Sequence, residues 1–270
     1  MTLTITVPEI EQRRKTTIRI ALVLEYDGTD YFGFQWQANA PSIQGAVENA
    51  LEKLTGEKVR VLGSSRTDTG VHARGQVVSF NTNSSLQVAA FVDGLNYHLP
   101  EDIAVKSAHQ VNDSFLVRSM TVSREYSYYF LNSRTRSPMT SRFAYRVAGK
   151  LDVAAMNRAC QTLVGIHDFA SFASNISDEL EKSTIREVYQ AKVVRDGDNV
   201  IFNIIANAFV RHQIRSTAGA LMQVGLHRLS EAELFSLLEA KKVGLAGPTL
   251  PACGLCLERV NYPCSFEEMK

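Results

Sequence analysis

Apolar and polar residues alternate from Ile18 to Tyr26, and this period of two predicts a half-buried β-strand. From Ser42 onward the apolar residues recur with a period close to that of an α-helix, which predicts an amphipathic helix. Ser42 supplies the N-cap, Gly56 ends the helix, and the turn 27–30 (Asp-Gly-Thr-Asp) separates the two elements. The apolar stripe of the helix consists of Ile43, Val47, Ala50, Leu51 and Leu54.

The same two periods continue along the chain and predict further strands and helices. Strands are expected at 59–62, 77–80, 124–131, 191–195, 200–206 and 255–260. Helices are expected at 86–96, 152–165 and 210–225, and another begins at the capping box 230–233 (Ser-Glu-Ala-Glu). The turn 196–199 (Asp-Gly-Asp-Asn) joins two of these strands as a hairpin.

Two halves of similar size therefore follow the order strand, helix, strand, which predicts a duplicated α+β architecture whose sheets join. We expect the first half at 18–115 and the second at 116–270, after an N-terminal extension at 1–17. No low-complexity linker separates the halves, so one continuous body is expected.

The composition is that of a globular protein, with 270 residues of which 45% are hydrophobic and 21% are charged. The sequence has neither a membrane-length apolar stretch nor an apolar signal-peptide core, so we expect no membrane contact and a cytoplasmic location. The four cysteines fit a reducing compartment. Cys253 and Cys256 form a C-x-x-C motif, typical of zinc or redox sites, but nearby metal ligands and a helix start are missing. Incidental small residues are the favoured interpretation.

The formal net charge is only +1, but segment 114–150 contains seven cationic residues and one carboxylate, Glu125. Aromatic residues are interleaved with these charges, a pattern typical of nucleic-acid surfaces. A solvated face of a sheet is the alternative interpretation.

A polar loop from Gly63 to Gln76 carries one carboxylate, Asp68, and polar loops on rigid scaffolds often carry chemistry. An aspartate that bonds its own backbone in a turn is the alternative. No P-loop, G-x-G-x-x-G, H-E-x-x-H or G-x-S-x-G motif occurs, so nucleotide hydrolysis, dinucleotide redox chemistry and the common hydrolases lack support. Arg211 and Arg215 share a helix face and need an anionic partner or form surface salt bridges. We interpret His212, on the same helix, as a surface or interface residue.

A series of motifs, in order and covering nearly all of the chain after residue 18, resembles the TruA-type tRNA pseudouridine synthases. The motifs are EYDG (25–28), GFQ (33–35), SIQG (42–45), RTDTGVHA (66–73), LPEDI (99–103), REY (124–126), GIHDF (165–169), FVRHQIR (209–215) and PACGL (251–255). The departures from the family pattern are Phe34, Ser64-Ser65, Thr69 and Leu250. Ser65 replaces a usual glycine, so the backbone path of the loop could differ there.

The resemblance implies a pseudouridine synthase fold, with a continuous, mainly antiparallel sheet, helices on one side and a catalytic cleft on the other. It implies isomerisation of uridine to pseudouridine at positions 38–40 of the tRNA anticodon stem-loop. This reaction is redox-neutral, so no metal, nucleotide or other cofactor is expected. The implied partners are tRNA and a second copy of the chain in a homodimer.

The resemblance also assigns roles to individual residues. Asp68 is the implied catalytic carboxylate, as nucleophile or as base, and Arg215 is the cation that keeps it ionised, ideally through a bidentate pair. Tyr126 packs on the flipped uracil and Arg66 fills the space that this base leaves. Leu255 lines the pocket. Arginines expected to contact tRNA phosphates, mainly on the basis of charge, are Arg118, Arg134, Arg136 and Arg142.

Two other classes of function remain open at this stage. A carboxylate-dependent nucleosidase or glycoside hydrolase could use Asp68 together with a second carboxylate, for which Asp30 and Asp168 are the candidates. A non-catalytic RNA-binding module could use the basic aromatic segment alone, although it would not need a buried Asp–Arg pair.

Overall fold

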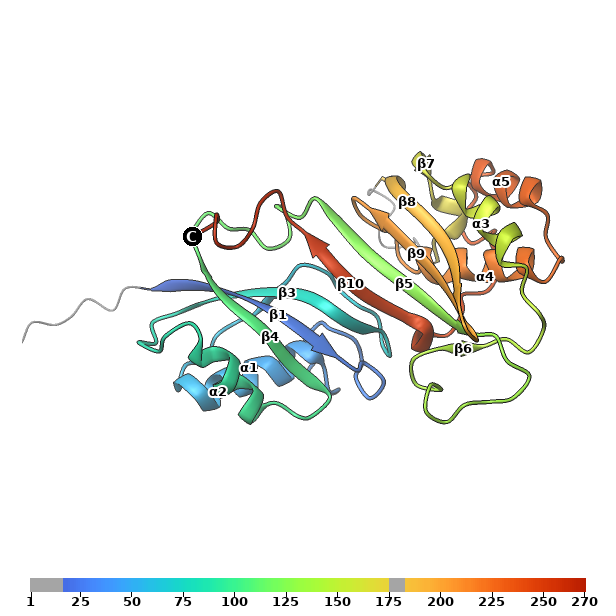
Figure 1. Ribbon diagram of the computed structural model, residues 1–270. Coiled ribbons are helices and arrows are strands. Elements are labelled where there is room, and N and C mark those ends of the chain that lie inside the picture. Colours follow the sequence, from blue (N-terminus) through green and yellow to red (C-terminus); the bar gives the residue numbers. More distant parts are fainter. Residues whose placement is uncertain (1–16, 175–182) are drawn as a thin grey trace, which may run out of the picture.

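The computed structural model describes residues 17–174 and 183–270, and Figure 1 shows them as one long sheet with helices packed against it. Within these residues ten strands have the order β4-β1-β3-β10-β5-β9-β8-β7, with β2 paired to β3 and β6 to β5. The strands are β1 (Ile18–Tyr26), β2 (Leu62–Gly63), β3 (His72–Thr82), β4 (Ile103–Val111), β5 (Ser123–Leu131), β6 (Tyr145–Arg146), β7 (Gly165–Asp168), β8 (Ile185–Asp196), β9 (Asn199–Ala206) and β10 (Leu255–Asn261). The expected extension at 1–17 lies outside the described residues except for Thr17.

The described strand pairs are antiparallel except for β10 with β3 and β6 with β5, so the predicted mainly antiparallel α+β fold is confirmed. The last strand, β10, lies between the two halves, where Cys256 pairs with His72 of β3 and also with Ser127 of β5. Both halves therefore meet along β10 (Figure 1).

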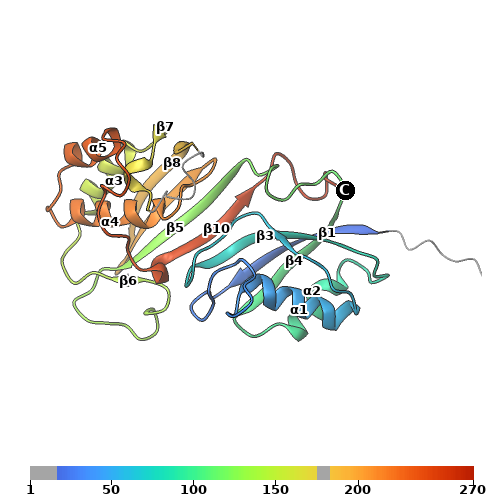
Figure 2. The ribbon, with the colours of Figure 1, turned by 180° about the vertical axis from the view of Figure 1, so that it is seen from behind.

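The helices form two groups, both on the sheet face that is nearer to the viewer in Figure 2. They are α1 (Ile43–Thr55) and α2 (Ala90–His98) over the first half, and α3 (Val153–Gln161), α4 (Gln213–Gly225) and α5 (Glu231–Glu239) over the second. Of two 3₁₀ turns, η1 (Ala170–Phe172) contacts α4 and α5, and η2 (Ala252–Gly254) contacts β5. Phe80 of β3 packs on Phe91 of α2 with ring centroids 5.8 Å apart, one contact of the core beneath the first group. No helix in the described part is both long and apolar enough to span a membrane.

Capping residues fix several helix ends where the sequence predicts them. Ser42 Oγ accepts a hydrogen bond from the Gly45 backbone N–H at 3.2 Å, and Gly56 ends α1 at φ 72°. The capping box of Ser230 and Glu233 is present at the start of α5. The hairpin of β8 and β9 also forms at the predicted turn, with Gly197 at φ 57°.

Other predicted boundaries are wrong by a few residues. α3 ends at Gln161 and not at 165, because Gly165 has a φ of 112° and begins β7. α4 begins at Gln213 and not at 210, because His212 has a left-handed backbone. The strand predicted at 59–62 is reduced to β2, and the helix predicted at 86–96 lies at Ala90–His98. The pattern analysis misses β4, although buried Ile103 and Val105 alternate at its start.

Candidate active site

A cavity of about 670 Å³ opens beside the polar loop between β2 and β3. Its lining comes from this loop, from β5 and β10, and from the segment between β9 and α4. Both halves of the chain therefore contribute side chains to one cavity, at the place where β10 joins them.

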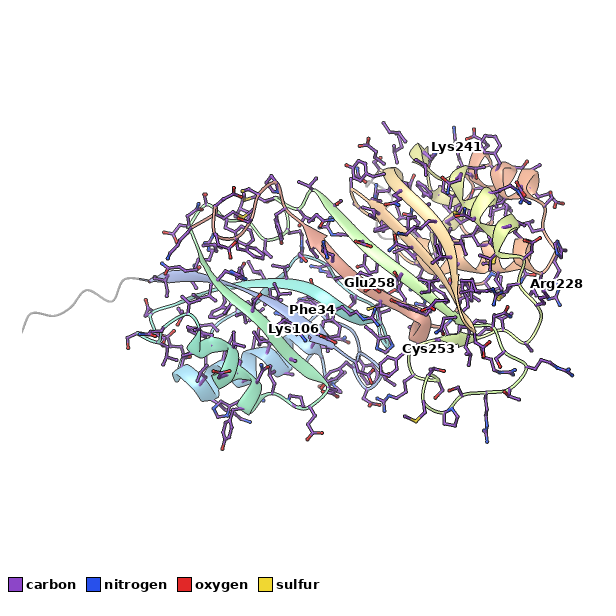
Figure 3. All side chains as sticks on the ribbon, in the orientation of Figure 1. Phe34, Lys106, Arg228, Lys241, Cys253 and Glu258 are labelled. Atoms are coloured by element: carbon purple, nitrogen blue, oxygen red, sulfur yellow. The ribbon has the colours of Figure 1, made fainter. Side chains whose placement is uncertain are left out.

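The cavity lies on the same face of the sheet as the helices, which corrects the expected cleft on the opposite face. Tyr126, in the cavity lining, and Tyr128 are two residues apart on β5, so their side chains share one face. Tyr128 packs beneath the second helical group: its hydroxyl donates to the Pro251 carbonyl at 2.8 Å, and a Cβ on Gly254 would lie 2.6 Å from its ring. The opposite face carries polar groups such as Glu258, visible in the middle of the sheet in Figure 3.

Asp68 is held by the backbone on both sides of it. Val71 N–H donates to the Asp68 carbonyl at 3.1 Å, and Phe34 N–H donates to the Thr67 carbonyl at 3.0 Å. The Thr67 hydroxyl also bonds the Tyr26 hydroxyl at 2.8 Å. The Asp68 side chain remains 39% exposed, so a fixed loop presents a carboxylate that a ligand in the cavity can reach.

Arg215 faces Asp68, as the family resemblance implies, but the pair is not bidentate. Arg215 Nη1 lies 3.5 Å from Asp68 Oδ2, while Arg215 Nε donates to the Leu250 carbonyl at 2.7 Å. The guanidinium is only 15% exposed, so its attraction for the carboxylate is weakly screened by water.

His212 is a second neighbour of Asp68, and its interpretation as a surface or interface residue is wrong. Its Nε2 lies 3.3 Å from Asp68 Oδ2, and its Nδ1 lies 2.6 Å from Ser174 Oγ. Burial lowers the pKa of His212; the Asp68 carboxylate opposes this effect, whereas the Arg215 and Arg211 charges reinforce it. The sequence signal for this contact is the spacing of three residues between His212 and Arg215, which brings the two side chains close together at the start of the helix.

Tyr126 lies at the floor of the cavity and is 7% exposed. Its ring meets Phe209 edge to face, with centroids 5.4 Å apart. Burial raises the pKa of Tyr126 to about 12, so the hydroxyl is protonated at neutral pH. Leu255, which is buried, and Arg66, which is exposed, also line the cavity. The five residues predicted for catalysis and substrate binding therefore come together in one place.

Ser65, which replaces the glycine usual in the family, is held in the loop by hydrogen bonds. Among the described non-glycine residues, positive φ occurs at His212, His227 and Lys241, so neither Ser65 nor Thr69 needs a glycine-like backbone. Arg124 Nε donates to Ser65 Oγ at 3.0 Å, and Gln76 Nε2 donates to the Ser65 carbonyl at 2.8 Å.

Arg124 also ties the loop to the second half, a role that the sequence analysis does not identify. Its Nη2 donates to the Ser64 carbonyl at 3.0 Å and its Nη1 to the Asn207 carbonyl at 2.9 Å. Asn207 follows β9, whereas Ser64 follows β2. One guanidinium therefore bonds backbone groups from both halves across the floor of the cavity.

Most charges in the cavity lining are positive. The lining arginines are Arg66, Arg118, Arg124, Arg186, Arg211 and Arg215, and Asp68 is the one carboxylate that the described lining contains. Burial, and then the charge of Arg66, lowers the pKa of Arg118, so these two cations lie near each other. Neighbouring cations of this kind favour a polyanionic ligand.

The other predicted phosphate contacts have different surroundings. Arg134 and Arg136 are exposed on the loop between β5 and β6, outside the cavity lining. Arg142 Nε lies 3.1 Å from Asp27 Oδ2, and its Nη2 pairs with Asp30, so two carboxylates offset its charge. The aromatic residues of the basic segment are mostly core: Tyr128 and Phe130 are fully buried. Tyr126 is the aromatic residue of β5 that lines the cavity.

The aspartates and cysteines considered for other kinds of chemistry do not line the cavity. Asp30 is paired with Arg142, and Asp168 accepts hydrogen bonds from the Ala170 backbone and the Thr184 hydroxyl. Neither aspartate lines the cavity, so Asp68 has no second carboxylate there among the described residues. Cys253 and Cys256 are free thiols, and burial raises the pKa of both. Within the described part no cluster of His, Cys, Asp and Glu could hold a metal ion.

A family model and individual relatives of this chain point to the same family. A family model described as tRNA pseudouridine synthase matches residues 22–118 and 159–263. The tRNA pseudouridine synthase A of Roseiflexus castenholzii is 45% identical over 248 residues, covering 90% of each chain. The tRNA pseudouridine synthase A of Geotalea daltonii is 41% identical over 243 residues, covering 90% of this chain and 99% of the relative.

Proposed function

This chain belongs to the tRNA pseudouridine synthase family, and on that premise we propose that it isomerises uridine to pseudouridine at positions 38–40 of the tRNA anticodon stem-loop. In this reaction the bond between ribose C1′ and uracil N1 breaks, the base turns, and C1′ bonds C5 instead. The C5 proton is lost and N1 gains a proton, so the composition of the nucleotide does not change and no cofactor is required.

We propose Asp68 as the carboxylate that acts at the glycosidic bond, as nucleophile or as base toward the sugar. The observation that supports this role most directly is its position: a 39% exposed carboxylate on a fixed loop, 3.5 Å from Arg215. Arg215 would keep the carboxylate ionised while a bound base excludes water, because desolvation alone favours the neutral acid.

The cavity floor supports a flipped base. Tyr126 offers an apolar ring and a protonated hydroxyl, and Leu255 offers an apolar wall, which suits a pyrimidine that stacks and accepts hydrogen bonds. Arg66 lies two residues before Asp68 at the exposed rim, where it would occupy the gap left in the stem. Unstacking a base costs a few kcal/mol, so a side chain that replaces it in the helix reduces this cost.

We further propose that Arg118 contacts a phosphate of the anticodon stem beside Arg66, since both line the cavity and face no described carboxylate. Arg134 and Arg136 remain proposed phosphate contacts on an exposed loop. For Arg142 this proposal has little support, because Asp27 and Asp30 already pair with it.

The family also supports two proposals about the setting of the enzyme. We propose that two copies form a homodimer, which a mass measurement in solution tests. We propose that the enzyme acts in the cytoplasm, with 18–115 and 116–270 as its two halves.

Mapping of pseudouridine in tRNA incubated with the purified protein tests the function. New pseudouridine at positions 38–40 is the expected result. Free uracil together with an abasic site would instead indicate a nucleosidase. Bound but unchanged tRNA would indicate an RNA-binding module, and either of these results would overturn the proposal.

A further inference from the structure

His212 holds an unusual backbone conformation at the entrance to α4. Its φ of 62° and ψ of 3° lie in the left-handed region, which few non-glycine residues adopt. Such strain costs free energy and persists where the surroundings hold the residue in place. At this position the imidazole faces the loop of Asp68, with Nε2 3.3 Å from Asp68 Oδ2.

Both ring nitrogens of His212 have partners. Nδ1 lies 2.6 Å from Ser174 Oγ, and Nε2 lies 3.3 Å from Asp68 Oδ2. Ser174 is itself held, because its backbone N–H donates to the Arg211 carbonyl at 3.3 Å. The imidazole therefore bridges the segment after η1 and the loop after β2, and its side chain is only 22% exposed.

Burial favours the neutral form of the His212 ring and lowers its pKa below the ordinary value. Among the described residues the Asp68 carboxylate opposes this effect, and the Arg215 and Arg211 charges reinforce it. A neutral imidazole has one N–H donor, and the Asp68 carboxylate can only accept. With the proton on Nε2 the ring would present its N–H to the carboxylate, and Nδ1 would accept the Ser174 hydroxyl proton, so Ser174 would select this tautomer.

We propose that His212 is a positioning residue that, with Arg215, holds Oδ2 of Asp68 and leaves Oδ1 free to face the ribose. This inference rests on the proposed function of Asp68. Both side chains contact Oδ2, and within the described residues Oδ1 accepts no hydrogen bond. Arg215 places a positive charge beside Asp68. The neutral His212 orients the carboxylate without adding a second positive charge.

Two substitutions of His212 distinguish the loss of its N–H donor toward Asp68 from a change in side-chain size. His212→Gln places an amide N–H near the position of Nε2, and this donor does not titrate. His212→Asn tolerates the left-handed backbone well, but its shorter side chain does not reach Asp68. Ser174→Ala leaves the ring and removes the group that selects its tautomer. The matched control is His227→Asn, since His227 also has a positive φ (56°) and lies outside the cavity lining.

The measurements are tRNA affinity and the rate of pseudouridine formation in a single turnover. His212→Asn should slow the single-turnover rate about tenfold and change tRNA affinity less than about twofold, as expected for the loss of one polar contact to a charged group. His212→Gln should restore most of the rate, and Ser174→Ala should fall between the two.

The outcomes distinguish this inference from the proposed function. If the wild-type protein forms no pseudouridine, the proposed function fails. If the wild type is active and His212→Asn keeps its rate, only the positioning role fails. Equal losses of rate in the Gln and Asn variants would indicate a structural role and would also overturn it. His227→Asn should match the wild type throughout.

Discussion

Arg215 contacts Asp68 through one nitrogen only: Nη1 lies 3.5 Å from Asp68 Oδ2, and Nε is bonded to the Leu250 carbonyl at 2.7 Å. The hydrogen bond to Leu250 fixes the guanidinium plane before any substrate arrives. Asp68 therefore faces a guanidinium that is already fixed in place, and its other oxygen, Oδ1, remains available to the cavity.

Asp68→Asn should abolish pseudouridine formation while the fold and the tRNA affinity persist. The amide keeps the size of the side chain but can act neither as nucleophile nor as base. Single-turnover assays and binding titrations check this, with Asp93→Asn on the exposed side of α2 as the control. Measurable turnover by Asp68→Asn would exclude the catalytic role of this carboxylate.

Arg215→Lys should reduce the single-turnover rate about tenfold to a hundredfold and leave tRNA binding nearly unchanged. A lysine retains the charge but lacks the planar fork that faces Asp68 and Leu250 together. Arg228→Lys, at the far end of the second half in Figure 3, is the matched control. An unaltered rate in Arg215→Lys would argue against the ion pair as part of the chemistry.

Local signals in the sequence predict both ends of α1 and the start of α5. Ser42 and Gly56 cap α1 through bonds within a few residues, so their effect is readable from the chain itself. The position of β10 between β3 and β5 is different, because it depends on pairing between Cys256 and residues as distant as His72. Periodicity predicts that a strand exists but carries no information about such a partner.

The same distinction applies to the candidate site. Asp68 and Arg215 follow from motifs, whereas the contact of His212 with Ser174 depends on how two loops meet. The charge count of segment 114–150 overestimates the positive charge that Arg142 can offer to tRNA. Its partner Asp27 lies more than a hundred residues earlier in the chain, so the count does not include it.

Arg118→Ala should weaken tRNA binding and reduce the slope of log affinity against log salt by about 1, because one released counterion is lost. Arg142→Ala should leave the slope nearly unchanged, because Asp27 and Asp30 already offset that charge. Binding titrations over a range of salt concentrations measure both slopes. Equal slopes for Arg118→Ala and the wild type would contradict the phosphate contact.

Arg124→Met should lower the free energy of unfolding by about 2 kcal/mol, because the Ser64 and Asn207 carbonyls lose a charged donor. Denaturant unfolding measures this loss, and the control is Arg134→Met on the exposed loop between β5 and β6. That control should stay within about 0.5 kcal/mol of the wild type, as for most surface substitutions. Similar stabilities of the two variants would contradict a role for Arg124 in joining the halves.

Tyr126 gives the fold a dependence on alkaline pH, since burial raises its pKa to about 12. The unfolded chain releases this proton near pH 10, so the stabilisation is complete below about pH 10 and is lost between about pH 10 and pH 12. Two pKa units correspond to about 2–3 kcal/mol. Tyr126→Phe should therefore lose less stability than the wild type between about pH 10 and about pH 12 in denaturant unfolding. Tyr97→Phe, at an 84% exposed position, should follow the wild type, and a Tyr126→Phe curve parallel to the wild type would contradict the buried, protonated hydroxyl.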